Sequence, residues 1–177
     1  MIKNKKILIL GGYGFLGNAL YKSLKDNCFT YRFGQYSKKK ISIFNLKKIK
    51  KHFNVIIHCA GGSSVNESIK NPKKDFNKTV GSTKALIKFI KLKKINPTII
   101  YISSPAVFGN SIKKKTIHPI SPYGKNKLIS EKLLLNFAKE KKLKLYIVRF
   151  FSLYGEGLKK QLLWDVLCKA KKKYFFI

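Results

Sequence analysis

The sequence is poor in arginine, acidic residues and cysteine, and each shortage narrows the possible functions. Arginine occurs only at Arg32 and Arg149, so nearly all of the 39 basic residues are lysines. Only seven acidic residues oppose them, which gives a formal net charge of +32. Such a charge would suit a nucleic-acid-binding protein. However, the lysines are spread over nearly every segment. Arginine, whose guanidinium usually binds phosphates and bases through paired hydrogen bonds, is scarce. We therefore expect no specific nucleic-acid partner.

Cysteine and long apolar runs are also scarce. Cys28, Cys59 and Cys168 show neither metal-site spacing nor an even disulfide framework, so we expect reduced thiols and no metal. The apolar runs, such as ILIL, are far too short to span a bilayer. The basic start is followed at once by GGYGFLG, without the apolar region and cleavage site of a signal peptide. These absences predict a cytoplasmic protein with no membrane partner.

Short apolar runs alternate with stretches of helical spacing, and this alternation predicts the fold class. Apolar strands separated by helices indicate an α/β fold with a doubly wound parallel sheet covered on both faces. The expected strands are residues 6–11, 28–33, 54–61, 98–104 and 144–151. The expected helices are residues 15–24, 46–52, 74–92, 123–141 and 160–171. The expected apolar stripe of the helix at residues 123–141 comprises Leu128, Ile129, Leu133, Leu134 and Phe137.

The stretch ILILGGYGFLG places Gly11, Gly14 and Gly17 between the first expected strand and the first expected helix. That context is typical of a dinucleotide-binding turn in a Rossmann-like fold. One glycine makes the turn, the next lets the backbone approach a pyrophosphate, and the last lets the helix pack on the strand. The helix start at Phe15 and Leu16 offers free N–H groups to phosphates. We predict NAD or NADP at this turn, with a ligand-free glycine turn as the alternative.

Tyr123 and Lys127 lie four residues apart at the start of an expected helix. The spacing alone is uninformative, because three tyrosines have a lysine four positions later and roughly two would do so by chance. On a helix, however, such side chains share one face. A nearby ammonium lowers the pKa of a phenol, which is otherwise about 10 and too high for a base at neutral pH.

The G-x-x-G-x-x-G spacing, the HCAGG motif at residues 58–62 and the pair Tyr123/Lys127 together resemble the extended short-chain dehydrogenase/reductase family, in its NAD-dependent epimerase/dehydratase branch. The resemblance covers essentially the whole chain. It implies that Tyr123 is a base assisted by Lys127, and that Ser104 in ISSPAVFG hydrogen-bonds the reacting oxygen. The cofactor contacts that it implies are Gly11, Gly14, Phe15, Leu16, Gly17, Arg32, Ala60, Gly61, Thr79, Ser103, Tyr123, Lys127 and Phe151.

Some positions depart from the family's pattern. Thr79 and Ser152 stand where asparagine is usual. The second strand ends without the acidic residue that binds the ribose of NAD. Arg32 and the lysines at residues 38–40 lie near that end, which favours NADP without deciding between the two cofactors.

The resemblance implies an epimerase or reductase acting on a nucleotide-activated sugar, in surface polysaccharide biosynthesis. Ser104 is followed by Pro105 and Ala106 instead of the acid pair of dehydratases, so dehydration is disfavoured. A non-catalytic or inactive truncated NAD(P)-binding module is the alternative.

Family members continue past an NAD(P)-binding domain into a substrate lobe. Here we expect residues 1–177 to form that domain, with the lobe absent or only begun at about residues 158–177. The resemblance also implies a homodimer through the helices at residues 74–92 and 123–141.

Overall fold

The computed structural model describes residues 4–34, 43–110, 116–158 and 161–171. Five parallel strands form one sheet in the order β2-β1-β3-β4-β5. They are β1 (Lys6–Leu10), β2 (Phe29–Phe33), β3 (Val55–His58), β4 (Thr98–Ser103) and β5 (Leu145–Arg149). The chain runs from β1 to β2 and then crosses back to β3 on the other side of β1. The Rossmann-like α/β fold expected from the sequence is confirmed.

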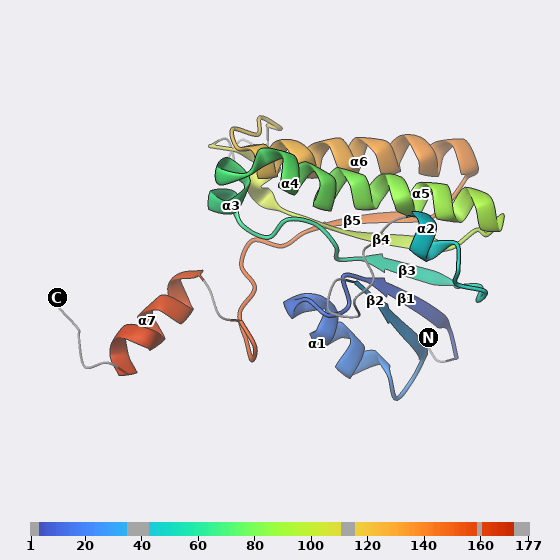
Figure 1. Ribbon diagram of the computed structural model, residues 1–177, viewed down its shortest axis with the longest axis horizontal. Coiled ribbons are helices and arrows are strands. Elements are labelled where there is room, and N and C mark those ends of the chain that lie inside the picture. The colour runs from blue at the N-terminus through green and yellow to red at the C-terminus, as the bar shows by residue number, and fades with distance from the viewer. Residues whose placement is uncertain (1–3, 35–42, 111–115, 159–160, 172–177) are drawn as a thin grey trace.

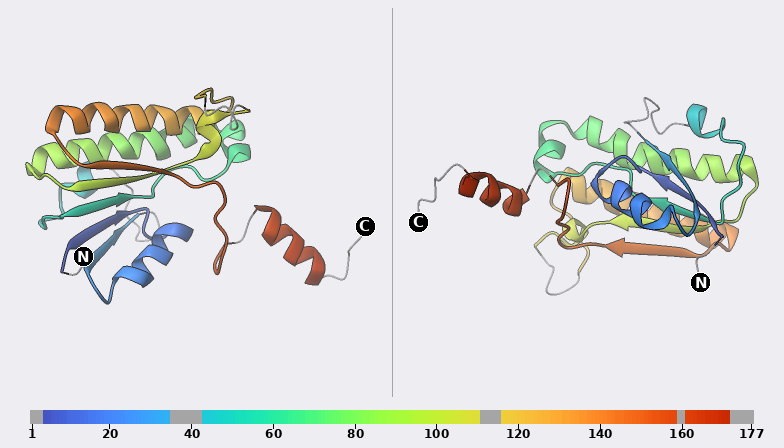
Figure 2. Two further views of the ribbon diagram at one scale, coloured as in Figure 1. Left: turned by 180° about the vertical axis from the view of Figure 1, so that it is seen from behind. Right: turned by 90° about the horizontal axis from the view of Figure 1, so that it is seen from below.

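Helices cover both faces of this sheet (Figure 1). α1 lies on one face, and α4, α5 and α6 lie on the other. In both views of Figure 2, α7 stands apart from the sheet. The helical elements are α1 (Phe15–Leu24), α2 (Ile43–Leu46), α3 (Val65–Lys70), α4 (Pro72–Phe76), the π-helical η2 (Asn77–Gly81), α5 (Ser82–Lys93), the 3-10 helix η3 (Pro105–Phe108), α6 (Pro122–Lys141) and α7 (Gln161–Lys171).

The side chains of β1 alternate between two apolar cores. Leu8 and Leu10 belong to the larger core, which α5 and α6 complete. Ile7 and Ile9 face the smaller core, against Leu20 of α1. Because both sides of β1 are covered, its sequence is apolar throughout instead of alternating with polar residues.

The prediction of a helix at residues 46–52 is wrong. The short helix α2 ends at Leu46, and no helix follows among residues 47–53. Leu46, Ile49 and Phe53 all reach the larger core, at spacings of three and four residues that imitate a helical stripe. The helix α3 was not expected. It begins after Ser64, whose hydroxyl accepts a hydrogen bond from the Glu67 N–H at 3.3 Å.

The helix expected at residues 74–92 is present as α4, η2 and α5 in direct succession. Asn71 caps its start by accepting a hydrogen bond from the Lys74 N–H at 3.0 Å, and Lys94 ends it in the left-handed conformation. The π-helical segment in its middle is a feature often found at functional sites. It carries the buried Thr79, whose side chain faces the end of β3.

The apolar stripe expected on α6 is partly wrong. Leu134 and Phe137 are buried, but Ile129 is exposed. The first half of the helix buries polar side chains instead, among them Lys127 and Glu131. An apolar stripe is therefore replaced by a charged one where α6 approaches the carboxyl ends of the strands.

Glu131 joins α6 to the last two strands of the sheet. Its carboxylate accepts hydrogen bonds from Arg149 Nε at 2.9 Å and Nη2 at 2.6 Å, and from the Ser103 hydroxyl. The hydrogen bond to Glu131 raises the pKa of Arg149 above its ordinary value. The side chain of Glu131 is 2% exposed, so this pair is screened far less than a surface pair.

Replacing Gly17 by alanine should destabilise the fold. A Cβ on Gly17 would lie 2.3 Å from the Gly11 carbonyl oxygen and 2.7 Å from the Gly12 Cα. We expect Gly17→Ala to lower the free energy of unfolding by about 1–3 kcal/mol in urea titrations, as overpacking does. Gly81→Ala is the control, because nothing lies within 4 Å of its Cβ position. It should raise stability by about 0.4–1 kcal/mol. Equal effects of the two substitutions would contradict this account.

Glu131→Gln should also destabilise the protein, because it leaves the Arg149 guanidinium without its carboxylate. Arg149 is 29% exposed, so we place the loss at the lower end of the range for broken buried pairs, about 3 kcal/mol. Glu140→Gln removes an exposed carboxylate that lies 3.5 Å from Lys91 and 3.4 Å from Lys141. That control should cost less than about 1 kcal/mol in the same unfolding measurement. A loss at Glu131 no greater than the loss at Glu140 would reject the proposed role of the pair.

Candidate active site

The glycine turn lies where β1, β3 and α1 meet. Gly11 adopts a positive φ of 79°, and its N–H donates to the Phe33 carbonyl at 2.7 Å. A Cβ on Gly11 would lie 2.7 Å from the Ala60 nitrogen, so only glycine fits there. Gly14 is the extended N-cap of α1, with no side-chain cap. The first N–H groups of α1, including those of Phe15 and Leu16, have no partner within the helix and are available to an anion.

Arg32 lies on β2, beside the glycine turn. Its guanidinium donates to Asn18 Oδ1 at 2.9 Å and lies 4.6 Å and 3.9 Å from the ring centroids of Tyr13 and Tyr21. A Cβ on Gly12 would lie 2.9 Å from the Arg32 side chain. A fixed cation therefore stands at the end of β2, where NAD-binding turns carry an acidic residue. The lysines at residues 38–40 lie outside the described residues.

The chain after β3 forms the floor of the site. Ala60 packs behind Gly11, and Gly61 follows with a φ of 151°. The Gly62 N–H donates to the Thr79 hydroxyl at 2.8 Å, and Thr79 is fully buried. The Thr79 hydroxyl thus holds the glycine pair of the HCAGG motif. His58, at the end of β3, is a core histidine as expected, with its Nε2 3.0 Å from the Thr83 hydroxyl.

Tyr123 and Ser104 approach each other from two elements. Ser104 directly follows β4 and caps η3, where its hydroxyl accepts a hydrogen bond from the Ala106 N–H at 3.2 Å. Tyr123 opens α6, and its N–H donates to the Ser68 hydroxyl of α3 at 3.0 Å. The Ser104 hydroxyl lies near enough to the Tyr123 phenol to lower its pKa. Sequence reasoning missed Ser68, because α3 itself was not expected.

Lys127 lies one turn below Tyr123, with its Nζ 5.8 Å from the Tyr123 ring centroid. The Nζ donates to the Ile102 carbonyl at 2.8 Å, and the residue is only 4% exposed. Burial lowers the pKa of Lys127 to about 8, and the carboxylates of Asp75 and Glu131 act in the opposite direction. The ammonium form is thus retained at neutral pH but lost in mildly alkaline solution.

The pKa of Tyr123 is raised above its ordinary value. Burial is the largest cause, the hydrogen bond from Ser104 acts in the opposite direction, and Asp75 adds to the rise. The lowering expected from Lys127 is therefore not produced by the protein groups alone. The reason is that burial and Asp75 disfavour the phenolate more strongly than Ser104 stabilises it.

Two further candidate cofactor residues differ in their exposure. The Ser103 hydroxyl is committed to Glu131 and is buried. Phe151 follows β5 in a loop and is 64% exposed. The same loop returns toward the start of α1, since a Cβ on Gly155 would lie 3.9 Å from the Phe15 ring.

Asp75 and Asn126 also belong to the site, and sequence reasoning missed both. Asn126 Nδ2 donates to Asp75 Oδ2 at 2.7 Å, and both residues are buried. The only signal in the sequence was a carboxylate within a lysine-rich helix.

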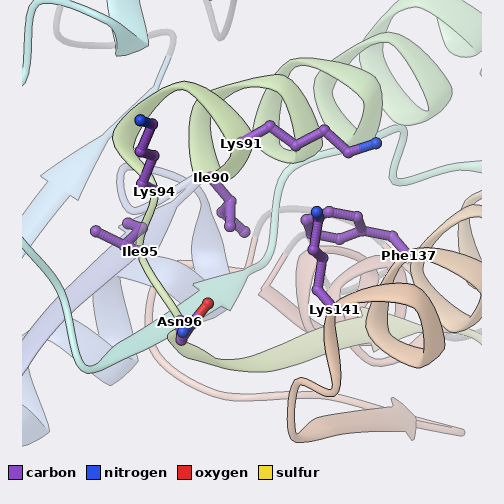
Figure 3. Close-up of a pocket in the computed structure, with 7 residues that line it drawn as sticks. All are labelled: Ile90, Lys91, Lys94, Ile95, Asn96, Phe137 and Lys141. Atoms are coloured by element: carbon purple, nitrogen blue, oxygen red, sulfur yellow. The ribbon is translucent and has the colours of Figure 1, made fainter.

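Other features lie away from this site. Among the described residues, no group of three or more His, Cys, Asp or Glu side chains could hold a metal ion. No helix in the described part of the chain is both long and apolar enough to cross a membrane. A hollow of about 340 Å³ between the ends of α5 and α6 is lined by Lys91, Lys94 and Lys141 among others (Figure 3). Because Asn96, just before β4, also lines it, the hollow lies at the opposite edge of the sheet from the glycine turn.

Known proteins resemble this chain in sequence and fold. The "Probable UDP-arabinose 4-epimerase 3" of Arabidopsis thaliana is 29% identical over 108 residues, which cover 58% of this chain and 26% of that relative. This chain thus matches only about a quarter of the length of that curated relative.

Two solved structures show the same fold. A UDP-N-acetylglucosamine 4-epimerase from Methanobrevibacter ruminantium superimposes with a TM-score of 0.84 at 21% identity, over 97% of this chain and 64% of its own. A dTDP-4-dehydrorhamnose reductase from Bacillus anthracis, in complex with NADP, does so with a TM-score of 0.80 at 22% identity, over 98% of this chain and 62% of its own.

The decisive match is to a family. The sequence model of the "NAD dependent epimerase/dehydratase family" matches residues 7–173, which is nearly the whole chain. The strand order, the glycine turn and the Tyr123/Lys127 helix all lie within that match. The chain belongs to the NAD dependent epimerase/dehydratase family.

Proposed function

We propose that this chain provides the NAD(P)-binding and hydride-transfer site of an epimerase or reductase that acts on a nucleotide-activated sugar. One observation carries the proposal: Ser104, Tyr123 and Lys127 converge at the carboxyl edge of the sheet. This edge also carries the Gly11–Gly17 turn, at the point where the chain reverses from β2 to β3. Ligands of open α/β sheets bind at such a switch point.

The residues around the turn fit a dinucleotide. Gly11 and Gly17 let β1, β3 and α1 pack closely around the turn, and the start of α1 at Phe15 directs N–H groups toward a pyrophosphate. Arg32 would serve the adenosine end, where its guanidinium favours a 2′-phosphate and hence NADP. Gly61 and Lys127 would lie at the nicotinamide end, with Lys127 holding the ribose hydroxyls.

The catalytic roles follow from the hydrogen-bond chemistry. A bound nicotinamide supplies the hydride acceptor and a positive ring. Tyr123 takes the proton of the sugar hydroxyl, and the Ser104 hydroxyl donates to the same oxygen. The protein alone raises the pKa of Tyr123, so the phenolate needs the Lys127 ammonium together with the positive ring.

Both epimerases and reductases occur among the similar proteins, so the proposal keeps both reactions. We place the activity in the cytoplasm and in the supply of sugars for surface polysaccharide. One observation favours the second candidate, a binding module without turnover. The Thr79 hydroxyl, at a position where the family usually has asparagine, is buried and already occupied by the Gly62 N–H.

Tyr123→Phe should abolish turnover and leave cofactor affinity unchanged. Loss of a positioned general base costs about 100-fold to 10,000-fold in rate. Tyr146→Phe, on the exposed edge strand β5, is the control and should behave as the parent. Binding of NAD(H) and NADP(H) is measured by calorimetry. Turnover is measured with UDP-, GDP- and dTDP-sugars as substrates.

Retained turnover in Tyr123→Phe would reject the assignment of the base. Binding of the cofactor by a parent protein that turns over none of these sugars would favour the module.

We further propose a homodimer through the outer surfaces of α5 and α6, which leave Leu92 and Ile129 exposed. A net charge of +32 repels a second copy, and salt screens that repulsion. Light scattering should therefore show more dimer as ionic strength rises. Ile129→Glu should weaken the dimer, whereas Phe29→Glu on the distant edge strand β2 should not. A monomer at every salt and protein concentration would rule out this assembly.

A further inference from the structure

Only two of the seven acidic side chains are buried, and both act on Lys127. Asp75 is 5% exposed and Glu131 is 1% exposed, whereas the other five are exposed. Each raises the pKa of Lys127. A buried carboxylate is costly unless it is hydrogen-bonded or paired. Two such groups beside one ammonium, in a chain with so few acids, therefore call for a specific explanation.

The two carboxylates differ in how far their charge is neutralised. Glu131 is bound by both Nε and Nη2 of Arg149, at 2.9 Å and 2.6 Å. Asp75 accepts from the uncharged amide of Asn126 at 2.7 Å, and no ion pair among the described residues involves it. The negative charge of Asp75 therefore remains available to Lys127.

Asp75 and Lys127 lie against neighbouring residues of one turn. The Asp75 Oδ1 lies 1.7 Å from the position that a Cβ on Gly62 would take. The Lys127 Nζ lies 3.4 Å from the corresponding position on Gly61. The second glycine of the HCAGG motif thus makes room for the carboxylate, and the two charges share the floor of the site.

The remaining groups that face Lys127 carry no charge at neutral pH. Burial lowers the pKa of His58 to about 3 and raises that of Cys59 to about 12. Burial also raises the pKa of Tyr101 and of Tyr123. The titratable groups around Lys127, from β3, β4, α4 and α6, are His58, Cys59, Tyr101, Asp75, Tyr123 and Glu131.

We propose that Asp75 is a positioning residue that acts through Lys127. Asp75 lies on α4 and is held by Asn126. Its negative charge keeps the Lys127 amine protonated beside Tyr123. The inference rests on the proposed function of that pair and adds its regulation by pH. A negative charge holds protons on every group near it. Its removal therefore lowers both apparent pKa values of the coupled Tyr123–Lys127 pair, whichever group loses its proton first.

The test compares Asp75→Asn, which removes the charge and keeps the shape, with the parent. The probe is the Cε resonance of isotopically labelled Lys127, assigned by its loss in Lys127→Met. Its midpoint should lie near pH 8 in the parent and fall by about one unit or more in Asp75→Asn. Glu67→Gln makes the same charge change on the neighbouring helix α3, at an exposed position, and should leave the midpoint unchanged.

Asn126→Ala separates charge from packing. It removes the hydrogen bond to Asp75 but keeps the carboxylate, so the Lys127 midpoint should not fall. Equal falls in Asn126→Ala and Asp75→Asn would show a merely structural role and overturn the proposal. An unchanged midpoint in Asp75→Asn would overturn it as well.

A measurement on the parent covers the case in which Asp75→Asn does not fold. The chain has only three aspartates, Asp26, Asp75 and Asp165, so the labelled Cγ resonance of Asp75 can be assigned. It should show an inflection at the Lys127 midpoint, near pH 8. Absence of that inflection would overturn the proposal without any variant.

The pH profile of turnover then connects the charge to the reaction. In Asp75→Asn, both the acidic and the alkaline limb of the pH profile of turnover should move to lower pH. In the control, Glu67→Gln, neither limb should move. The resonance shifts need no substrate, so they test Asp75 even if no sugar is turned over. If the resonances shift and turnover is absent, the proposed function fails and the role of Asp75 stands. If turnover is present and the resonances do not shift, the role of Asp75 fails alone.

Discussion

The Lys127 ammonium lies where water hardly reaches, and the surrounding elements are arranged around that buried charge. It donates to the Ile102 carbonyl at the end of β4 and faces Gly61 after β3. A buried cation is tolerated only with hydrogen bonds and opposite charge nearby. The Ile102 carbonyl supplies the hydrogen bond, and the buried carboxylates of Asp75 and Glu131 supply the opposite charge.

Close backbone contact is the second constraint on the same edge of the sheet. Gly11 approaches Ala60, and Gly17 approaches Gly11, at distances that exclude any side chain. These contacts bring β1, β3 and α1 together around a turn that leads into the free N–H groups at the start of α1. The site can therefore offer backbone donors to a dinucleotide on one side and the Tyr123 phenol on the other.

The excess of positive charge makes the few carboxylates matter more. With a net charge of +32, most lysines lie on the surface, where salt screens them. Glu131 is neutralised by Arg149 and joins α6 to β4 and β5. No ion pair within the described part of the chain involves Asp75, so its charge acts on Lys127. Glu131 thus contributes to stability, and Asp75 contributes to the chemistry of the site.

The sheet, the glycine turn and the family could be predicted from the sequence, because they depend on local patterns. Fully apolar runs fix buried strands, and the three glycines meet steric needs within a few residues of one another. The helix at residues 15–24 was predicted to its exact bounds for the same reason. Residue spacing gave wrong predictions where contacts between distant parts of the chain determine which residues are buried. The core contacts of Leu46, Ile49 and Phe53 imitated a helix, and Ile129 was assigned to a stripe that Lys127 and Glu131 occupy.

The contacts between polar groups depend on the folded chain and could not be predicted from the sequence. Asp75 and Asn126 are 51 residues apart, and Tyr123 and Ser68 are 55 apart, so no spacing rule links them. Likewise, the direction of the Tyr123 pKa shift depends on burial, which the sequence did not reveal. The sequence named the Tyr123/Lys127 pair because its two members share one helix turn. The fold alone supplied its surroundings, because hydrogen bonds and desolvation depend on distance in space and not on position in the chain.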